Sequence, residues 1–235
     1  TLTAVLGGVI RFILDKAAPK FSNARGGIIA AGLLAGLVTG LFHTLLGIPA
    51  ILAGILTQMI LWSVNLKILG KANQAISARN YTVLLSQMDI PAALLLLLVF
   101  SLLTIALLYL FFGTELGCSI RATGCNPSMS RAQGINTNYT KVLGLALSNG
   151  IVALAGALLC QYQGYTDVNM GRGAVVIGLA AVVIGTAVVK RISPNFAVKL
   201  SGVLIGAVIY YIVYQSIIFL GFDTDLLKMF SAVVV

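Results

Sequence analysis

Six long apolar stretches, separated by short polar connectors, constrain the fold of this chain more than any other feature. A helix crosses the hydrocarbon core of a bilayer with about 20 apolar residues. The strongest stretch, Ile90–Phe112, contains a run of leucines at positions 94–98. Of the 235 residues, 59% are hydrophobic and only 9% are charged, too few charges to coat a core of this size in water. The stretches cover residues 26–46, 49–68, 90–112, 141–160, 174–189 and 200–221.

These stretches predict an all-α fold, a polytopic bundle of transmembrane helices. We expect about six complete spans, of which the one at 174–189 is short and suits a tilted helix, and two partial spans at 1–14 and 226–235. Residues 1–235 are interpreted as one transmembrane domain. The chain begins at Thr1 within an apolar stretch and stops within another. It is therefore interpreted as a fragment of a longer membrane protein, truncated at both ends.

The composition and the motifs exclude several classes of protein. The hydrophobicity is too high for a soluble enzyme or a disordered chain. Three cysteines, at positions 118, 125 and 160, make no disulfide framework, and His43 is the single histidine. The sequence has no phosphate-binding loop and no zinc motif, so we expect no catalytic residue, no metal and no cofactor in this chain. The net charge of +9 comes mainly from connectors, and no nucleic-acid module is present.

Glycines recur at every fourth position in two of the stretches. Gly32, Gly36 and Gly40 lie in the first, and Gly202 and Gly206 in the last. Such spacing places small residues on one helix face, where another helix backbone can approach closely in a membrane. We therefore expect these faces to pack against other helices, with no ligand implied.

A few polar side chains interrupt the apolar stretches. Gln58 and Asn65 are seven residues apart and share a helix face, with Trp62 between them. Asn149 lies within the fourth stretch, and Gln161 opens a polar and aromatic segment behind it. A polar group within the bilayer must form a hydrogen bond with another group or line a water-filled pathway. We therefore take these four amides as candidates for a substrate pathway, with hydrogen bonding between helices as the alternative.

The segment 113–140 is the one long polar connector. It reads Arg121-Ala122-Thr123-Gly124-Cys125-Asn126-Pro127-Ser128-Met129-Ser130-Arg131-Ala132-Gln133-Gly134-Ile135-Asn136-Thr137. This motif resembles the signature of the membrane permease subunits of bacterial ABC importers in the branched-chain amino acid and ribose permease superfamily. Within it, the chain is most similar to permeases that work with a tryptophan/tyrosine-type substrate-binding lipoprotein. The resemblance extends over most of the chain, although an acidic residue is usual at the position of Cys125.

The resemblance implies that 113–140 is a cytoplasmic coupling loop whose short helix docks on a separate ATPase subunit. Asn126 and Pro127 suit the start of that helix, as cap and first-turn residue, and Gly134 suits its end. Arginines can make charge-assisted contacts across an interface. The residues implied in coupling are Arg121, Thr123, Gly124, Asn126, Pro127, Met129, Arg131 and Gly134. A polar loop with ordinary turn residues is the alternative interpretation.

The function implied is import of a small solute, an amino acid, across the bacterial plasma (inner) membrane by alternating access. The implied partners are an ABC-type ATPase subunit that binds the ATP, an extracytoplasmic solute-binding lipoprotein, a second permease copy and the lipid membrane. A secondary transporter or channel without an ATPase, and a structural membrane subunit, are the alternatives. The scarcity of intramembrane charge disfavours a secondary transporter. Counting basic residues in the connectors does not decide the orientation, so the cytoplasmic position of 113–140 rests on the resemblance.

Overall fold

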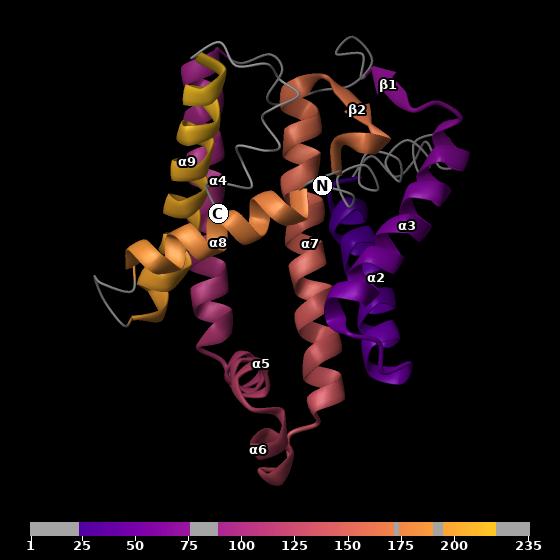
Figure 1. Cartoon of the computed structure of the whole chain (residues 1–235), viewed down its shortest axis with the longest axis vertical. Helices are drawn as coiled ribbons and strands as arrows, with labels where there is room; N and C mark the ends of the chain where they lie inside the picture. The colour runs from indigo at the N-terminus through magenta and orange to yellow at the C-terminus, as the bar shows by residue number, and fades with distance from the viewer. Residues whose placement is uncertain (1–23, 76–88, 172–173, 190–194, 220–235) are drawn as a thin grey trace. The chain divides into compact units, whose positions relative to one another are not determined.

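The computed structural model describes residues 24–75, 89–171, 174–189 and 195–219 (Figure 1). The chain divides into two compact units. The first unit comprises residues 1–97 and 112–171, and the second comprises residues 98–111 and 172–235. Each unit is described by itself.

The all-α, polytopic prediction is confirmed, because each of the six apolar stretches forms a helix. Five of these helices are long and apolar enough to cross a membrane. The sixth, at 174–189, has the short length expected of it, 16 residues. The two partial spans predicted at 1–14 and 226–235 lie outside the described residues. The helices are α2 (Ala24–Leu45), α3 (Ala50–Leu69), α4 (Ile90–Phe112), α7 (Thr137–Gln163), α8 (Ala174–Val189) and α9 (Phe196–Phe219).

Helix α7 is longer than its apolar stretch predicts, at 27 residues instead of the span 141–160. It begins where the Asn136 side chain accepts hydrogen bonds from the backbone N–H groups of Asn138 and Tyr139, at 3.2 and 3.3 Å. It ends at Gly164, whose φ of 72° is left-handed. Hydropathy locates only the part of a helix that lies in lipid, whereas caps decide where the hydrogen-bonded helix ends.

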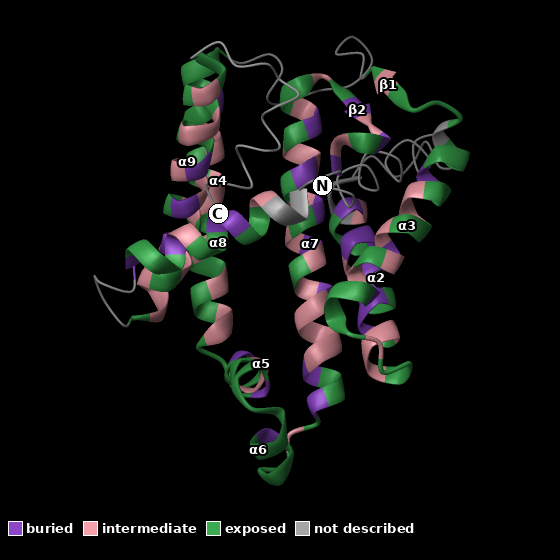
Figure 2. Cartoon of the chain, in the orientation of Figure 1, coloured by how far each residue is buried: buried purple, intermediate pink, exposed green. Residues whose placement is uncertain are grey.

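The first unit is built on close contact between α2 and α7. The two helices run in opposite directions, because Gly32, Gly36 and Gly40 face successively earlier residues of α7. A Cβ atom on Gly36 would lie 2.5 Å from the Cα atom of Ala146, and one on Gly32 would lie 2.6 Å from the Asn149 carbonyl oxygen. Buried bands follow α2 and α7 in Figure 2. The glycine face of α2 therefore packs backbone against backbone, as predicted.

Helix α3 packs on α2 with a polar contact inside the apolar interface. The Thr39 hydroxyl donates to the Thr57 hydroxyl at 3.0 Å, and both side chains are buried. Thr57 also donates to the carbonyl of Ala53 in its own helix at 2.9 Å. These bonds satisfy both hydroxyl groups away from water, which makes the contact compatible with lipid surroundings.

A two-stranded ribbon, which the sequence did not predict, joins the ends of α3 and α7. Strand β1 (Asn73–Ala75) follows α3 and pairs antiparallel with β2 (Tyr165–Asp167), which follows α7. Gln74 lies opposite Thr166 in the register. The N–H of Val168, the first residue of the 3-10 helix η1 (Val168–Gly171), donates to the Ala72 carbonyl at 3.0 Å. The C-terminal ends of α3 and α7 are thereby held together.

In the second unit, α8 packs against α9 through small residues. A Cβ atom on Gly206 would lie 2.5 Å from the backbone nitrogen of Gly185, and one on Gly202 would lie 2.6 Å from a methyl group of Val189. The predicted packing role of Gly202 and Gly206 is therefore confirmed. Tyr210 is buried on the same helix and stacks on Tyr214, with ring centroids 6.4 Å apart.

Candidate functional site

Two short helices occupy the polar segment between α4 and α7, where the sequence predicted one. Helix α5 runs over Glu115–Cys125 and α6 over Pro127–Ala132. The Thr114 side chain caps α5 by accepting from the backbone N–H of Gly117 at 3.3 Å. Residues Arg121, Thr123 and Gly124, which the sequence placed in a loop, therefore lie on α5. We refer to these two helices as the α5–α6 pair.

The predicted start of the short helix α6 is confirmed. Asn126 is its N-cap, and its side-chain oxygen accepts from the backbone N–H of Met129 at 3.1 Å. Pro127 is the first helical residue, where the missing N–H of proline costs nothing. The Met129 side chain is 62% exposed, although it is large and apolar. Asn126 and Pro127 therefore begin a short helix on which the apolar side chain of Met129 is exposed.

The end of α6 is tied to the start of α7. Arg131 Nε donates a 2.8 Å hydrogen bond to the hydroxyl of Thr137, the first residue of α7. Gly134 takes a left-handed conformation, with φ of 81°, in the turn between them. Ser130 and Thr137 are buried in this joint. The backbone turn and the side-chain bond together fix the direction in which α6 leaves α7.

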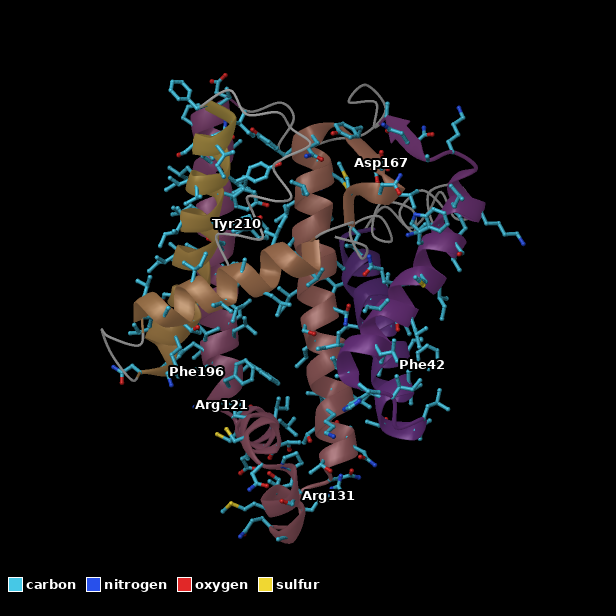
Figure 3. The ribbon with its side chains drawn as sticks, in the orientation of Figure 1. Phe42, Arg121, Arg131, Asp167, Phe196 and Tyr210 are labelled. Carbon is cyan, nitrogen blue, oxygen red and sulfur yellow. The ribbon has the colours of Figure 1, made fainter. Side chains whose placement is uncertain are left out.

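Helix α5 is tied to α7 as well. The hydroxyl groups of Thr123 and Thr140 lie 3.0 Å apart, and both residues are 4% exposed. In Figure 3, Arg121 and Arg131 lie at the same end of the unit, at the foot of α7. The pair thus buries Thr123 against Thr140 of α7 and leaves the other residues implied in coupling on the surface. The exposed members are Arg121, Gly124, Asn126, Pro127, Met129, Arg131 and Gly134.

The four predicted pathway residues fall into two groups in the first unit. Gln58 and Asn149 lie near the middle of α3 and α7 and are half-buried. Asn149 donates through its side-chain nitrogen to the Leu145 carbonyl of its own helix at 2.9 Å. Asn65 and Gln161 lie in the last turns of α3 and α7, which the ribbon holds together. The structure therefore brings Asn65 and Gln161 to one end, opposite the α5–α6 pair.

The end of α3 and α7 contains polar atoms that have no partner. Among the described residues, both side-chain polar atoms of Asn65, Gln161 Oε1, Trp62 Nε1 and the Thr166 hydroxyl are buried without a hydrogen bond. Thr166 was not predicted, because a three-residue strand has no readable period in the sequence. His43, by contrast, is satisfied, since its Nδ1 donates to the Ile48 carbonyl at 2.7 Å.

The number, length and apolar character of the helices together define a polytopic membrane protein. The family model described as branched-chain amino acid transport system / permease component matches residues 4–235. The chain therefore belongs to this family of ABC-type permeases. As such it is a non-catalytic, multi-pass permease of the plasma membrane, and permeases of ABC transport systems work with ATPase and substrate-binding partners.

Two relatives cover most of the chain. The chain is 37% identical over 207 residues to the tyrosine transport system permease protein of Clostridioides difficile (strain R20291), a match covering 88% of this chain and 68% of that protein. It is 32% identical over 208 residues to an uncharacterized protein of Rickettsia prowazekii (strain Madrid E), covering 88% of this chain and 74% of that protein. No solved structure matches the chain significantly.

Proposed function

We propose that this chain is the permease subunit of an ATP-driven importer that carries an amino acid across the plasma membrane by alternating access. The ATP is bound by a separate ATPase subunit, and an extracytoplasmic solute-binding lipoprotein delivers the solute to a permease dimer. The α5–α6 pair faces the cytoplasm and docks on the ATPase. The single observation that carries the proposal is the hydrogen-bonded connection of this pair to α7.

The connection supports coupling because it makes the α5–α6 pair move with α7. Arg131 bonds to Thr137 at one joint, and Thr123 bonds to Thr140 at the other. Helix α7 has 27 residues, about 40 Å at 1.5 Å per residue, which is long enough to reach across the hydrocarbon. Its glycine contact with α2 brings a second span into the same rigid body. A displacement of the pair by an ATPase would therefore move both spans together, as a rigid-body transition requires.

The solute is inferred from the relatives and from the polar side chains. One relative is a tyrosine transport permease, which favours an amino acid. The amides of Gln58, Asn65, Asn149 and Gln161 supply uncharged donors and acceptors along α3 and α7. The sequence-based assignment of these four residues to a pathway stays a prediction, as does that of the signature residues to ATPase docking.

Met129 offers the sharpest test of docking, because its exposed side chain is the largest apolar side chain on α6. The full-length permease is purified with its ATPase and lipoprotein, reconstituted into liposomes, and assayed for uptake of labelled tyrosine. We expect Met129→Glu to lose ATPase co-purification and uptake at least tenfold, because a charge would be buried in the interface. Met129→Leu, which keeps an apolar side chain, is the matched control and retains both.

Three results would contradict the proposal. Unchanged ATPase binding and uptake in Met129→Glu would remove α6 from the interface. Uptake of tyrosine by the wild-type permease without ATPase or nucleotide would instead support a secondary transporter or channel. No flux of any amino acid in the complete, ATP-hydrolysing complex would refute the assigned class of solute.

A further inference from the structure

Among the described residues, five buried polar atoms without partners lie on the C-terminal halves of α3 and α7 and on β2. Asn65 is 1% exposed, and neither its amide nitrogen nor its amide oxygen has a hydrogen bond within the described chain. Thr166 is 4% exposed, and its hydroxyl group has no hydrogen bond within the described chain. Gln161 and Trp62 each contain one buried polar atom that likewise has no hydrogen bond there. Buried polar groups are nearly always paired, so this set of unpaired atoms indicates a missing partner.

The backbone brings the segments that carry these side chains to the same end of the first unit. Thr166 is the central residue of β2 and lies opposite Gln74, which follows α3 closely. The Thr166 hydroxyl lies near the thiol of Cys160, but the two groups do not meet the geometry of a hydrogen bond. Cys160 directly precedes Gln161 in the chain. The 3-10 helix η1, directly after β2, packs on α3, which carries Trp62 and Asn65. The ribbon and η1 therefore bring the C-terminal ends of α3 and α7 together with β2, and these are the segments that carry the unpaired polar atoms.

The unpaired atoms include both hydrogen-bond donors and hydrogen-bond acceptors. Asn65 Nδ2 and Trp62 Nε1 are donors, Asn65 Oδ1 and Gln161 Oε1 are acceptors, and the Thr166 hydroxyl can be either. None of these groups is charged. Donors fit a carboxylate and acceptors fit an ammonium group, so a zwitterion of small size satisfies the set without leaving a net charge in the membrane.

We propose that Asn65, Trp62, Gln161 and Thr166 form a solute site for the amino and carboxylate groups of an amino acid, on the side of the permease opposite the α5–α6 pair. This rests on the proposed function and deepens it, because it places a solute contact at the end of α3 and α7. The ribbon is the scaffold of this site, and the solute supplies the hydrogen bonds that the protein leaves unmade.

The test separates a solute site from side chains that are merely unpaired. The full-length permease carrying Asn65→Leu, Gln161→Met or Thr166→Val is reconstituted with its ATPase and lipoprotein, and tyrosine uptake and ATP hydrolysis are measured together. We expect KM for uptake from the lipoprotein to rise about tenfold in each variant, the loss expected for one or two hydrogen bonds. Co-purification of the ATPase and the lipoprotein with each variant checks that the complex still assembles.

Thermal unfolding of the same variants adds a second measurement. Replacing unpaired polar atoms by apolar groups of similar shape should raise the unfolding midpoint slightly or leave it unchanged. Ser63→Ala is the matched control on α3, because this hydroxyl is exposed and, among the described residues, bonds to the Met59 carbonyl of its own helix. It should change neither KM nor the midpoint.

The proposal would be overturned by wild-type KM in all three variants, whatever their midpoints, in preparations whose wild type transports tyrosine. If one variant fails to fold, the other two decide. A wild-type complex that hydrolyses ATP but transports no amino acid would refute the proposed function instead, so the two failures are distinguishable.

Discussion

The hydroxyl group of Thr123 on α5 lies 3.0 Å from that of Thr140 on α7, and both side chains are buried. The two residues are not neighbours in the chain, and each hydroxyl group also lies within hydrogen-bonding distance of a carbonyl of its own helix, that of Ser119 for Thr123 and that of Thr137 for Thr140. Each hydroxyl group has one proton, so one of them donates to the other, which in turn donates to its own carbonyl. The contact therefore fixes the α5–α6 pair on α7 without leaving either hydroxyl group unsatisfied when the pair is docked.

Thr140→Val should loosen this joint while keeping its shape. The Thr123 hydroxyl keeps its bond to Ser119, so the loss is one net hydrogen bond, about 1 kcal/mol. We expect the ATPase still to bind, but the tyrosine transported per ATP hydrolysed to fall severalfold. Thr140→Ser restores the hydroxyl group and should restore the ratio. A wild-type ratio in Thr140→Val would show that the joint plays no part in coupling.

The α2–α7 contact predicts a strong effect of a single methyl group. In Gly36→Ala the new Cβ would lie 2.5 Å from the Cα of Ala146, so the helices must separate. We expect a loss of about 1–3 kcal/mol, seen as a lower thermal unfolding midpoint in detergent. Gly54→Ala on α3 is the matched control, since a Cβ there meets nothing within 4 Å. It should be neutral or stabilising by up to about 1 kcal/mol, because alanine favours the helix. Equal midpoints would contradict the packing.

The α8–α9 contact of the second unit can be tested in the same way. A Cβ on Gly206 of α9 would lie 2.5 Å from the backbone nitrogen of Gly185 on α8. A Cβ on Gly178, another glycine of α8, would meet no atom of the described residues within 4 Å. Gly206→Ala should lower the midpoint or the yield of folded protein, with a cost of about 1–3 kcal/mol. Gly178→Ala should behave as wild type. The prediction fails if both variants unfold at the wild-type temperature.

Local patterns were enough to predict the helices. Each apolar stretch must satisfy its own backbone in lipid, so composition alone leads to a helix over Ile90–Phe112 and its equivalents. The start of α6 was also predictable, because Asn126 and Pro127 act through bonds within three residues. The helix α5 was not recognised, since its residues are too polar to be a span and the signature appeared as a loop.

The hydrogen bonding of the intramembrane polar residues could not be predicted from local sequence patterns. Gln58, Asn65, Asn149 and Gln161 were indistinguishable in the sequence as amides near apolar runs. In the structure Asn149 bonds to Leu145 of its own helix, whereas Asn65 and Gln161 have buried atoms without a partner in the described part of the chain. Which of these outcomes holds depends on the neighbouring helix and on the ribbon, and no spacing within the chain encodes either.

The sequence by itself determined that this protein is a bundle of transmembrane helices, that glycine faces pack helix on helix, and that a capped helix begins at Asn126. Those properties follow from local free energies: burial of apolar side chains, backbone hydrogen bonds and caps. Only the tertiary structure decided that β1 pairs with β2, that Thr123 meets Thr140, and that Asn65, Gln161 and Thr166 share one end of the unit. These contacts join segments far apart in the chain, so no local pattern of residues encodes them.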